Sequence, residues 1–307
     1  MVELVTDPET SDTLQPFQIE GTNIRGRIAR LSGSYQGILG THLYPEPVAG
    51  ILGETIALTA AISTSLKFNG ILYLQTQSDG PVPMLITDVT SAGQMRGYAR
   101  YKEDALPTKN KASHSVPDLL GSGHLTFTLD QGTLMDRYQG IVALEGNTIA
   151  ECAQSYFLQS EQLETSIIIA AQPVADEFPP RVAIIMIQKM PGESRLIITA
   201  DEEDNHWQTA NILLNTLTAQ ELLDPRLSTD RLLYRLFNKI GIRLYEKKEI
   251  FYQCRCNQEK VAETLASFST KELDGMKTEA GKITATCEFC GTVYAFDDAR
   301  LNIFKGI

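Results

Sequence analysis

Four cysteines in the last part of the sequence have the type and spacing of a metal site. Cys254 and Cys256 form a Cys-x-Cys pair, and Cys287 and Cys290 form a Cys-x-x-Cys pair that Gly291 follows. Two such pairs supply the four sulfur ligands of a tetrahedral structural Zn²⁺ ion. A glycine directly after the second pair allows a tight turn whose amides point at the sulfurs. We therefore predict a Zn²⁺ site with these four cysteines as ligands.

The spacing leaves open whether these cysteines are only structural or also redox-active. A disulfide across the one-residue gap between Cys254 and Cys256 would close a small, strained ring. Strained disulfides are easily reduced, which suits a reversible switch better than a permanent link. On spacing alone, however, a permanently structural zinc ribbon is the simpler interpretation.

The remaining residues that could do chemistry indicate no enzyme. Cys152 lies apart in a helical pattern beside Ile149 and Tyr156, and we expect it to be a small buried apolar side chain. The four histidines have no metal-ligand spacing, and the sequence contains no phosphate-binding loop, dinucleotide fingerprint or nucleophile elbow. We predict no catalytic residues.

Composition and charge narrow the class of protein further. The chain has 307 residues, is 43% hydrophobic and carries a formal net charge of −11. This hydrophobic fraction is typical of a folded chain. The negative charge argues against a protein whose main role is to bind nucleic-acid phosphates. Five cysteines, an odd number, do not suggest a secreted disulfide framework. With no signal peptide evident at the first residues, we expect a cytoplasmic protein. The most apolar long stretch, 48–66, contains Glu54 and reads as a buried amphipathic helix.

The region before the cysteines must position them, and its patterns predict an α+β fold. Residues 1–191 are expected to form a mixed α/β domain with antiparallel-rich sheets. Its first strands would lie within 17–31, and the apolar runs at 167–171 and 181–188 suit central strands. Further strands are predicted at 71–77, 84–89, 95–101, 124–130 and 138–144, and a helix at 148–160.

Helical patterns dominate residues 192–250, which we predict to be a linker that lacks a large core of its own. It follows Pro191 and begins with an acidic run at 201–204. Thr218 and Glu221 form a capping box, and Thr229 or Asp230 can cap a later helix. The apolar stripe of that helix must pack against another part of the molecule, and Trp207 is expected to anchor the linker. The stripe consists of Leu232, Leu233, Leu236, Phe237 and Ile240.

Residues 251–307 form the predicted zinc-binding module. Two short strands at 283–286 and 293–296 flank the second cysteine pair like a hairpin. Between the pairs, Asn257 and the Ser269–Glu272 box predict helix starts, and Val261, Leu265 and Phe268 make a helical stripe. Few large apolar residues are present, whereas a structural zinc site contributes about 10–16 kcal/mol in small peptides. We infer that zinc folds this module.

Nearly the whole sequence resembles the 33-kilodalton heat-shock protein family, the redox-regulated bacterial holdase chaperones. At the C-terminal end the resemblance lies in the four cysteines with Tyr294 and Phe296 after them. In the N-terminal region it is carried by short motifs in a family-specific order. These motifs are at 44–48, 66–70, 75–81, 95–99, 138–142 and 160–163. The loop at 102–122 and Cys152 lie outside the pattern.

The resemblance implies a redox switch at the zinc site. The reduced, zinc-bound form would be a poor chaperone. Oxidants would pair Cys254 with Cys256 and Cys287 with Cys290, and zinc would be released. The linker at 192–250 would then unfold, and the protein, as a homodimer, would hold unfolding client proteins without ATP.

The client-binding surface is expected to include the apolar stripe of the linker once that stripe is exposed. We assign this role to Leu232, Leu236, Phe237 and Ile240. Partners would be unfolded or partly unfolded proteins, and we expect neither nucleic acid nor a membrane. The acidic net charge would keep such a complex in solution.

Three alternatives remain at this point. A zinc ribbon could bind nucleic acid, although the acidic balance disfavours it. A thiol–disulfide oxidoreductase could use Cys287 and Cys290, although Gly291 after the pair is more typical of a metal-binding turn. A constitutive chaperone with structural zinc would act alike when reduced and when oxidised.

Overall fold

The computed structural model describes residues 12–64, 68–107, 115–132, 135–173, 178–191, 199–278, 281–297 and 301. The chain divides into two compact units, Met1–Tyr252 and Gln253–Ile307. Leu66 and Lys67 of one resemblance motif, and the middle of the predicted loop at 102–122, lie outside the described residues.

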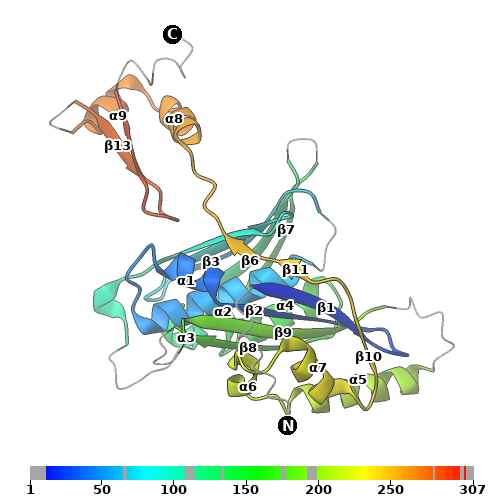
Figure 1. The fold of residues 1–307 in the computed structure, drawn as a ribbon. Coiled ribbons are helices and arrows are strands. Elements are labelled where there is room, and N and C mark those ends of the chain that lie inside the picture. The colour runs from blue at the N-terminus through cyan, green and yellow to red at the C-terminus, as the bar shows by residue number, and fades with distance from the viewer. Residues whose placement is uncertain are drawn as a thin grey trace. The chain divides into compact units, whose positions relative to one another are not determined.

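Two sheets, antiparallel except for one pair of strands, build the described part of the first unit (Figure 1). Sheet A has the order β10-β1-β2-β9-β8, and β11 pairs with β1 beside β10. Its strands are β1 (Thr13–Ile19), β2 (Ile24–Leu31), β8 (Thr165–Gln172), β9 (Arg181–Lys189), β10 (Ile242–Leu244) and β11 (Lys248–Glu249). Sheet B has the order β12-β5-β4-β3-β6-β7, in which only β12 and β5 are parallel. Its strands are β3 (Ile71–Ser78), β4 (Met84–Thr90), β5 (Gln94–Arg100), β6 (Gly123–Asp130), β7 (Tyr138–Ala143) and β12 (Phe251–Tyr252).

Helix α2 (Glu46–Ile62) runs between the two sheets and contacts strands of both (Figure 1). The prediction of a buried helix is correct, but its amphipathic character is wrong, because α2 is buried on nearly every side. A helix enclosed by two sheets has no solvent face, so its sequence is apolar all round. Thr55 and Thr59 fit there because their hydroxyls donate to carbonyls one turn back. No helix in the described ranges is both long and apolar enough to span a bilayer.

Four further helical segments are described before the linker, and the first and the last of them contact strands of both sheets. They are α1 (Gly33–Leu39), the 3₁₀ turn η1 (Glu103–Ala105), α3 (Val116–Leu119) and α4 (Ile149–Ser160). The side chain of Thr148 accepts the Glu151 amide and caps α4, as the sequence predicts. The mixed α+β architecture is therefore the one expected.

The apolar run at 167–171 does form a strand, but its predicted central position is wrong. Strand β8 ends sheet A, whereas β9 lies inside it between β2 and β8. Helices α2 and α4 and the short helix α6 (Ala219–Leu223) all pack on β8. A continuous apolar run shows that both faces of a strand are covered, but not that the strand has neighbours on both edges. Helices cover β8, so its sequence is apolar although it lies at the edge of the sheet.

Three helices of the predicted linker pack on the other face of sheet A (Figure 1). They are α5 (Ala200–Leu214), α6 and α7 (Thr229–Phe237). The acidic run forms the first turn of α5, where negative charge is favourable. The predicted cap of α7 is wrong by one residue: Ser228 accepts the Arg231 amide. Trp207 is partly buried against this layer, which confirms its predicted anchoring role.

The described part of the second unit contains two short helices and a hairpin. They are α8 (Gln258–Ala266), α9 (Thr270–Gly275), β13 (Ile283–Thr286) and β14 (Val293–Phe296). Asn257 caps α8, and Ser269 with Glu272 forms the predicted capping box of α9. Six apolar side chains form the buried cluster found in the described part of this unit: Ala262, Leu265, Leu273, Ile283, Phe296 and Leu301.

Candidate metal centre and the packed linker

The structure brings the four cysteines of the second unit together. Their Sγ atoms all lie within 4.8 Å of one another. Cys254 Sγ is 3.7 Å from Cys287 Sγ, and Cys256 Sγ is 3.4 Å from Cys290 Sγ. With Zn–S bonds of about 2.3 Å, the sulfurs of a tetrahedral site are about 3.8 Å apart. The donor set and its spacing therefore fit a Zn²⁺ ion.

Local backbone structure explains this convergence. Cys287 and Cys290 lie in the turn between β13 and β14, where the amides of Cys290 and Gly291 donate to the carbonyl of Cys287 at 3.3 and 2.8 Å. Gly291 has a φ of +69°, which a residue with a side chain rarely adopts. Cys254 and Cys256 lie in the extended segment that leads into α8. A turn and an extended segment thus each contribute two sulfurs.

The surroundings give these thiols unequal acidity. Burial acts to raise the pKa of Cys290, but hydrogen bonds from the hydroxyl and amide of Thr292 and from Cys256 outweigh it and lower that pKa to about 7. Burial raises the pKa of Cys287 to about 12. Cys290 is therefore the thiol best prepared to be a thiolate near neutral pH, and the thiolate is the form that binds metal and reacts with oxidants.

Two hydroxyl groups beside the sulfurs were not predicted as functional. The Tyr294 hydroxyl lies 3.0 Å from Cys256 Sγ, and Thr292 Oγ1 lies 3.2 Å from Cys290 Sγ. The hydrogen bond to Cys256 raises the pKa of Tyr294 to about 12, so its hydroxyl stays protonated and can donate to a thiolate. Partners of this kind orient and stabilise ligand sulfurs. Their position two and four residues after Cys290 is the sequence signal that could have found them.

The residues predicted to bind clients lie far from solvent in this state. Leu232, Leu236 and Phe237 are buried and Ile240 is partly buried, all in one apolar cluster with the outer face of sheet A. The ring of Phe237 lies 5.7 Å from that of Phe17 in β1. The linker stripe and the sheet face therefore cover each other, and separating them would expose both.

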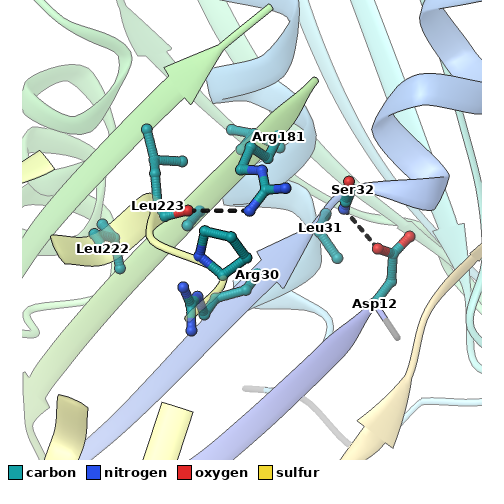
Figure 2. Close-up of a pocket in the computed structure, with 10 residues that line it drawn as sticks. Asp12, Arg30, Leu31, Ser32, Arg181, Leu222 and Leu223 are labelled. Carbon is teal, nitrogen blue, oxygen red and sulfur yellow. Dashed lines mark hydrogen bonds between the residues drawn. The ribbon is translucent and has the colours of Figure 1, made fainter. Parts of the chain in front are cut away.

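Two arginines of sheet A bind the end of α6 and the segment that follows it. Figure 2 shows Arg181 beside the carbonyl of Leu223. Arg30 donates to the carbonyl of Leu227 at 2.5 Å and also to that of Asp224. Arg181 donates to the carbonyl of Leu223 at 3.4 Å. Carbonyls at a helix end lack partners within the helix, and cations are favourable there. The linker is thus attached to sheet A by charge-assisted hydrogen bonds as well as by apolar packing.

Comparison with known proteins shows the family to which the chain belongs. The model of the family described as Hsp33 protein matches residues 12–297. The chain belongs to the Hsp33 family. It is 40% identical over 290 residues to the 33 kDa chaperonin of Caulobacter vibrioides strain NA1000 / CB15N, which covers 93% of this chain and 95% of the relative. It is 35% identical to the 33 kDa chaperonin of Shewanella loihica, with 96% of each chain covered.

A solved structure confirms the fold. The crystal structure of the 33 kDa chaperonin from Thermotoga maritima superposes with a TM-score of 0.79. Its sequence is 23% identical, and the match covers 96% of this chain and 98% of that one. The resemblance stated from the sequence is therefore confirmed, and the relatives bear the name of chaperonins rather than of enzymes.

Proposed function

We propose that this chain is a redox-regulated, ATP-independent holdase that binds unfolding proteins under oxidative stress. The observation that supports it best is the convergence of Cys254, Cys256, Cys287 and Cys290 in a chain of the Hsp33 family. We further propose that the protein works in the cytoplasm, as a homodimer when active. The three functional parts would be the core at 1–191, the linker at 192–250 and the zinc module at 251–307.

The first step is the oxidation of the four thiolates. Bound Zn²⁺ would hold the sulfurs as thiolates and tie the segment of Cys254 to the hairpin of Cys287. Two thiolates give up two electrons for each disulfide; with hypochlorous acid the other products are chloride and hydroxide. Bonds between Cys254 and Cys256 and between Cys287 and Cys290 would leave no thiolate ligands, so zinc would be released. The folding energy of the second unit is lost with the ligands.

The second step is the loss of the linker from sheet A. Strand β12 ends at Tyr252, two residues before Cys254, and it pairs with β5. Just upstream, β10 and β11 pair with β1 of sheet A. These strands are two or three residues long, and such short pairings contribute little stability alone. Unfolding that begins at Cys254 would therefore reach the linker through weak strand pairings.

The surface then exposed would bind clients. It would comprise the α7 stripe and the outer face of sheet A around Phe17, which together form one apolar cluster in the packed state. Contiguous apolar surface of this kind binds the apolar segments of unfolding proteins. The net charge of −11 would keep the complexes dissolved.

A titration of the reduced, zinc-loaded protein with hypochlorite tests the proposal. Zinc release, free thiols and suppression of the aggregation of a heat-denatured client are followed in the same samples. We expect zinc loss, the loss of four thiols and the gain of holding activity to coincide. Zinc loss without a gain in holding activity would contradict the switch, and equal activity before and after oxidation would support a constitutive chaperone.

A matched pair of variants sharpens this experiment. Cys287→Ser removes one proposed ligand, whereas Cys152→Ser removes the buried cysteine of the first unit. We expect Cys287→Ser to lose the zinc release that accompanies oxidation, and Cys152→Ser to keep it. Peptide mapping of the oxidised protein decides the pairing, because the structure also places Cys254 Sγ near Cys287 Sγ and Cys256 Sγ near Cys290 Sγ, at 3.7 and 3.4 Å. Disulfides that join a cysteine of one motif to a cysteine of the other would overturn the proposed pairing within each motif.

A further inference from the structure

A cavity of about 330 Å³ lies between the two sheets of the first unit. It is lined from sheet A by Arg27 of β2 and Gln188 of β9, and from sheet B by Leu72 of β3 and Phe127 of β6. Ile62, the last residue of α2, also lines it. The cavity therefore occupies the end of the layer where the helix between the sheets stops. Its volume is within the range of about 300–1,000 Å³ that small-molecule sites occupy.

A buried cation faces this space. Side chains alternate along a strand, and Ala29 and Leu31 on the same face of β2 belong to the core between the sheets, so Arg27 points into that layer. Arg27 is only 6% exposed. Its Nη1 donates to Gln188 Oε1 at 2.8 Å, and within the described residues no carboxylate forms an ion pair with it.

An anion would complete the hydrogen bonds of this guanidinium. Burial, with the nearby Arg25, lowers the pKa of Arg27 to about 10, which still leaves it charged at neutral pH. A buried charge is costly unless it is paired and hydrogen-bonded. A guanidinium has five N–H donors in a planar fork that matches a carboxylate, whereas Gln188 accepts only one of them.

The carboxylate found among the described lining residues is engaged elsewhere. Glu161 accepts hydrogen bonds from the hydroxyl of Tyr156, at 2.7 Å, and from that of Tyr138. Tyr138 is 48% exposed, so this part of the lining reaches the surface. A second anion is therefore disfavoured beside Glu161 and favoured beside Arg27.

The rest of the wall is apolar. Phe127 and Tyr156 stack with ring centroids 4.1 Å apart, and Leu129 and Phe157 complete this side. We propose that the cavity binds a small amphipathic carboxylate whose head pairs with Arg27 and Gln188 and whose hydrocarbon part lies against these aromatic and aliphatic side chains. The ligand class is a short- or medium-chain fatty acid or an aryl-alkanoic acid. The site is independent of the cysteines and of the proposed redox switch.

Calorimetric titration of the reduced, zinc-loaded full chain with octanoate tests the proposal, with 1-octanol as the neutral probe. We expect octanoate to bind the unaltered protein at least about tenfold more tightly than octanol. Because this comparison changes only the ligand, it needs no variant to fold. Equal affinity for the two probes, or no heat of binding with octanoate, would overturn the proposal.

Variants then locate the site. Arg27→Gln should weaken octanoate binding by about tenfold or more and leave octanol binding unchanged. Arg243→Gln, which removes an exposed charge from β10 of the same sheet, is the matched control and should bind octanoate normally. Arg27→Lys keeps the charge and should retain part of the affinity. Octanoate binding that is unaffected by Arg27→Gln in a folded variant would contradict the assignment.

Discussion

The layer around α2 and the C-terminal unit are stabilised in different ways. In the first unit α2 is buried between two sheets within a large continuous apolar cluster. In the second unit, the described residues bury six apolar side chains beside four converging thiols. Burial of apolar surface is sufficient for the first, whereas very small units usually need a metal or disulfides. Loss of the metal is therefore expected to unfold the second unit, whereas the layer around α2 should stay folded.

The cysteines of the two units show the same contrast. Cys152 is fully buried in the first unit, and burial raises its pKa to about 11. Cys290 has hydroxyl and amide donors beside it, and its pKa is lowered to about 7. A residue type that stays a protonated, buried thiol in one unit can thus ionise near neutral pH at one position of the other.

Metal removal should have the largest effect, which begins in the second unit and should leave the layer around α2 folded. Chelation of zinc from the reduced protein should abolish protection of the β13–β14 hairpin, because structural zinc contributes about 10–16 kcal/mol in small peptides. Hydrogen exchange followed by mass spectrometry checks this, with the amides of α2 as the internal control. A hairpin that stays protected without metal would show that its apolar cluster is sufficient.

Leu52→Ala should destabilise the first unit and leave the second unit unchanged. Leu52 is fully buried in α2, so the cavity left by the substitution should lower the free energy of unfolding of the first unit by about 2–5 kcal/mol. Zinc affinity should not change. Urea denaturation and a zinc competition assay measure the two quantities, and Leu265→Ala, in the cluster of the second unit, is the matched control. Weaker zinc binding in Leu52→Ala would show that the units depend on each other.

Glu54→Gln tests whether the first unit has a pH dependence of its own. Burial raises the pKa of Glu54 from 4.5 to about 7, although a hydrogen bond from the Ile149 amide acts to lower it. The raised pKa stabilises the folded protein below pH 4.5, and this contribution is lost as the pH rises to about 7. The variant should therefore be more stable than the unaltered chain above pH 7, by about 1–3 kcal/mol, and gain nothing at pH 4. Thermal unfolding across this range measures it, and a constant difference at all pH values would contradict the assignment.

Cys152→Ala should have the smallest effect. Loss of one buried sulfur should cost about 1 kcal/mol of stability and leave the oxidation of the other cysteines unchanged. In the native, metal-free chain, a maleimide should label the four clustered cysteines rapidly and Cys152 only after unfolding. Rapid labelling of Cys152 in the folded chain would contradict its burial.

Local features were predictable from the sequence. The two cysteine pairs, the Ser269–Glu272 box and the Asn257 cap each depend on residues a few positions apart. The strand at 181–188 was predictable for the same reason, since its apolar run is continuous in sequence. The buried character of Cys152 followed from its helical neighbours.

Long-range arrangement was not predictable in this way. The edge position of β8 and the all-round burial of α2 depend on which elements cover each face, and the sequence pattern does not specify the covering element. Arg27 looks like any other charged residue of a strand. Only the pairing with Gln188, 161 residues away, makes it a buried cation beside a cavity.

The sequence by itself predicted the cysteine cluster, several of the helix caps and the family, because these depend on residue type and short spacing. The tertiary structure alone decided that the linker stripe is packed on the outer face of sheet A, and that a cavity with a buried arginine remains where α2 ends. The physical reason is that burial is a property of contacts between distant segments. A side chain acquires its exposure, its pKa and its partners only when those segments meet.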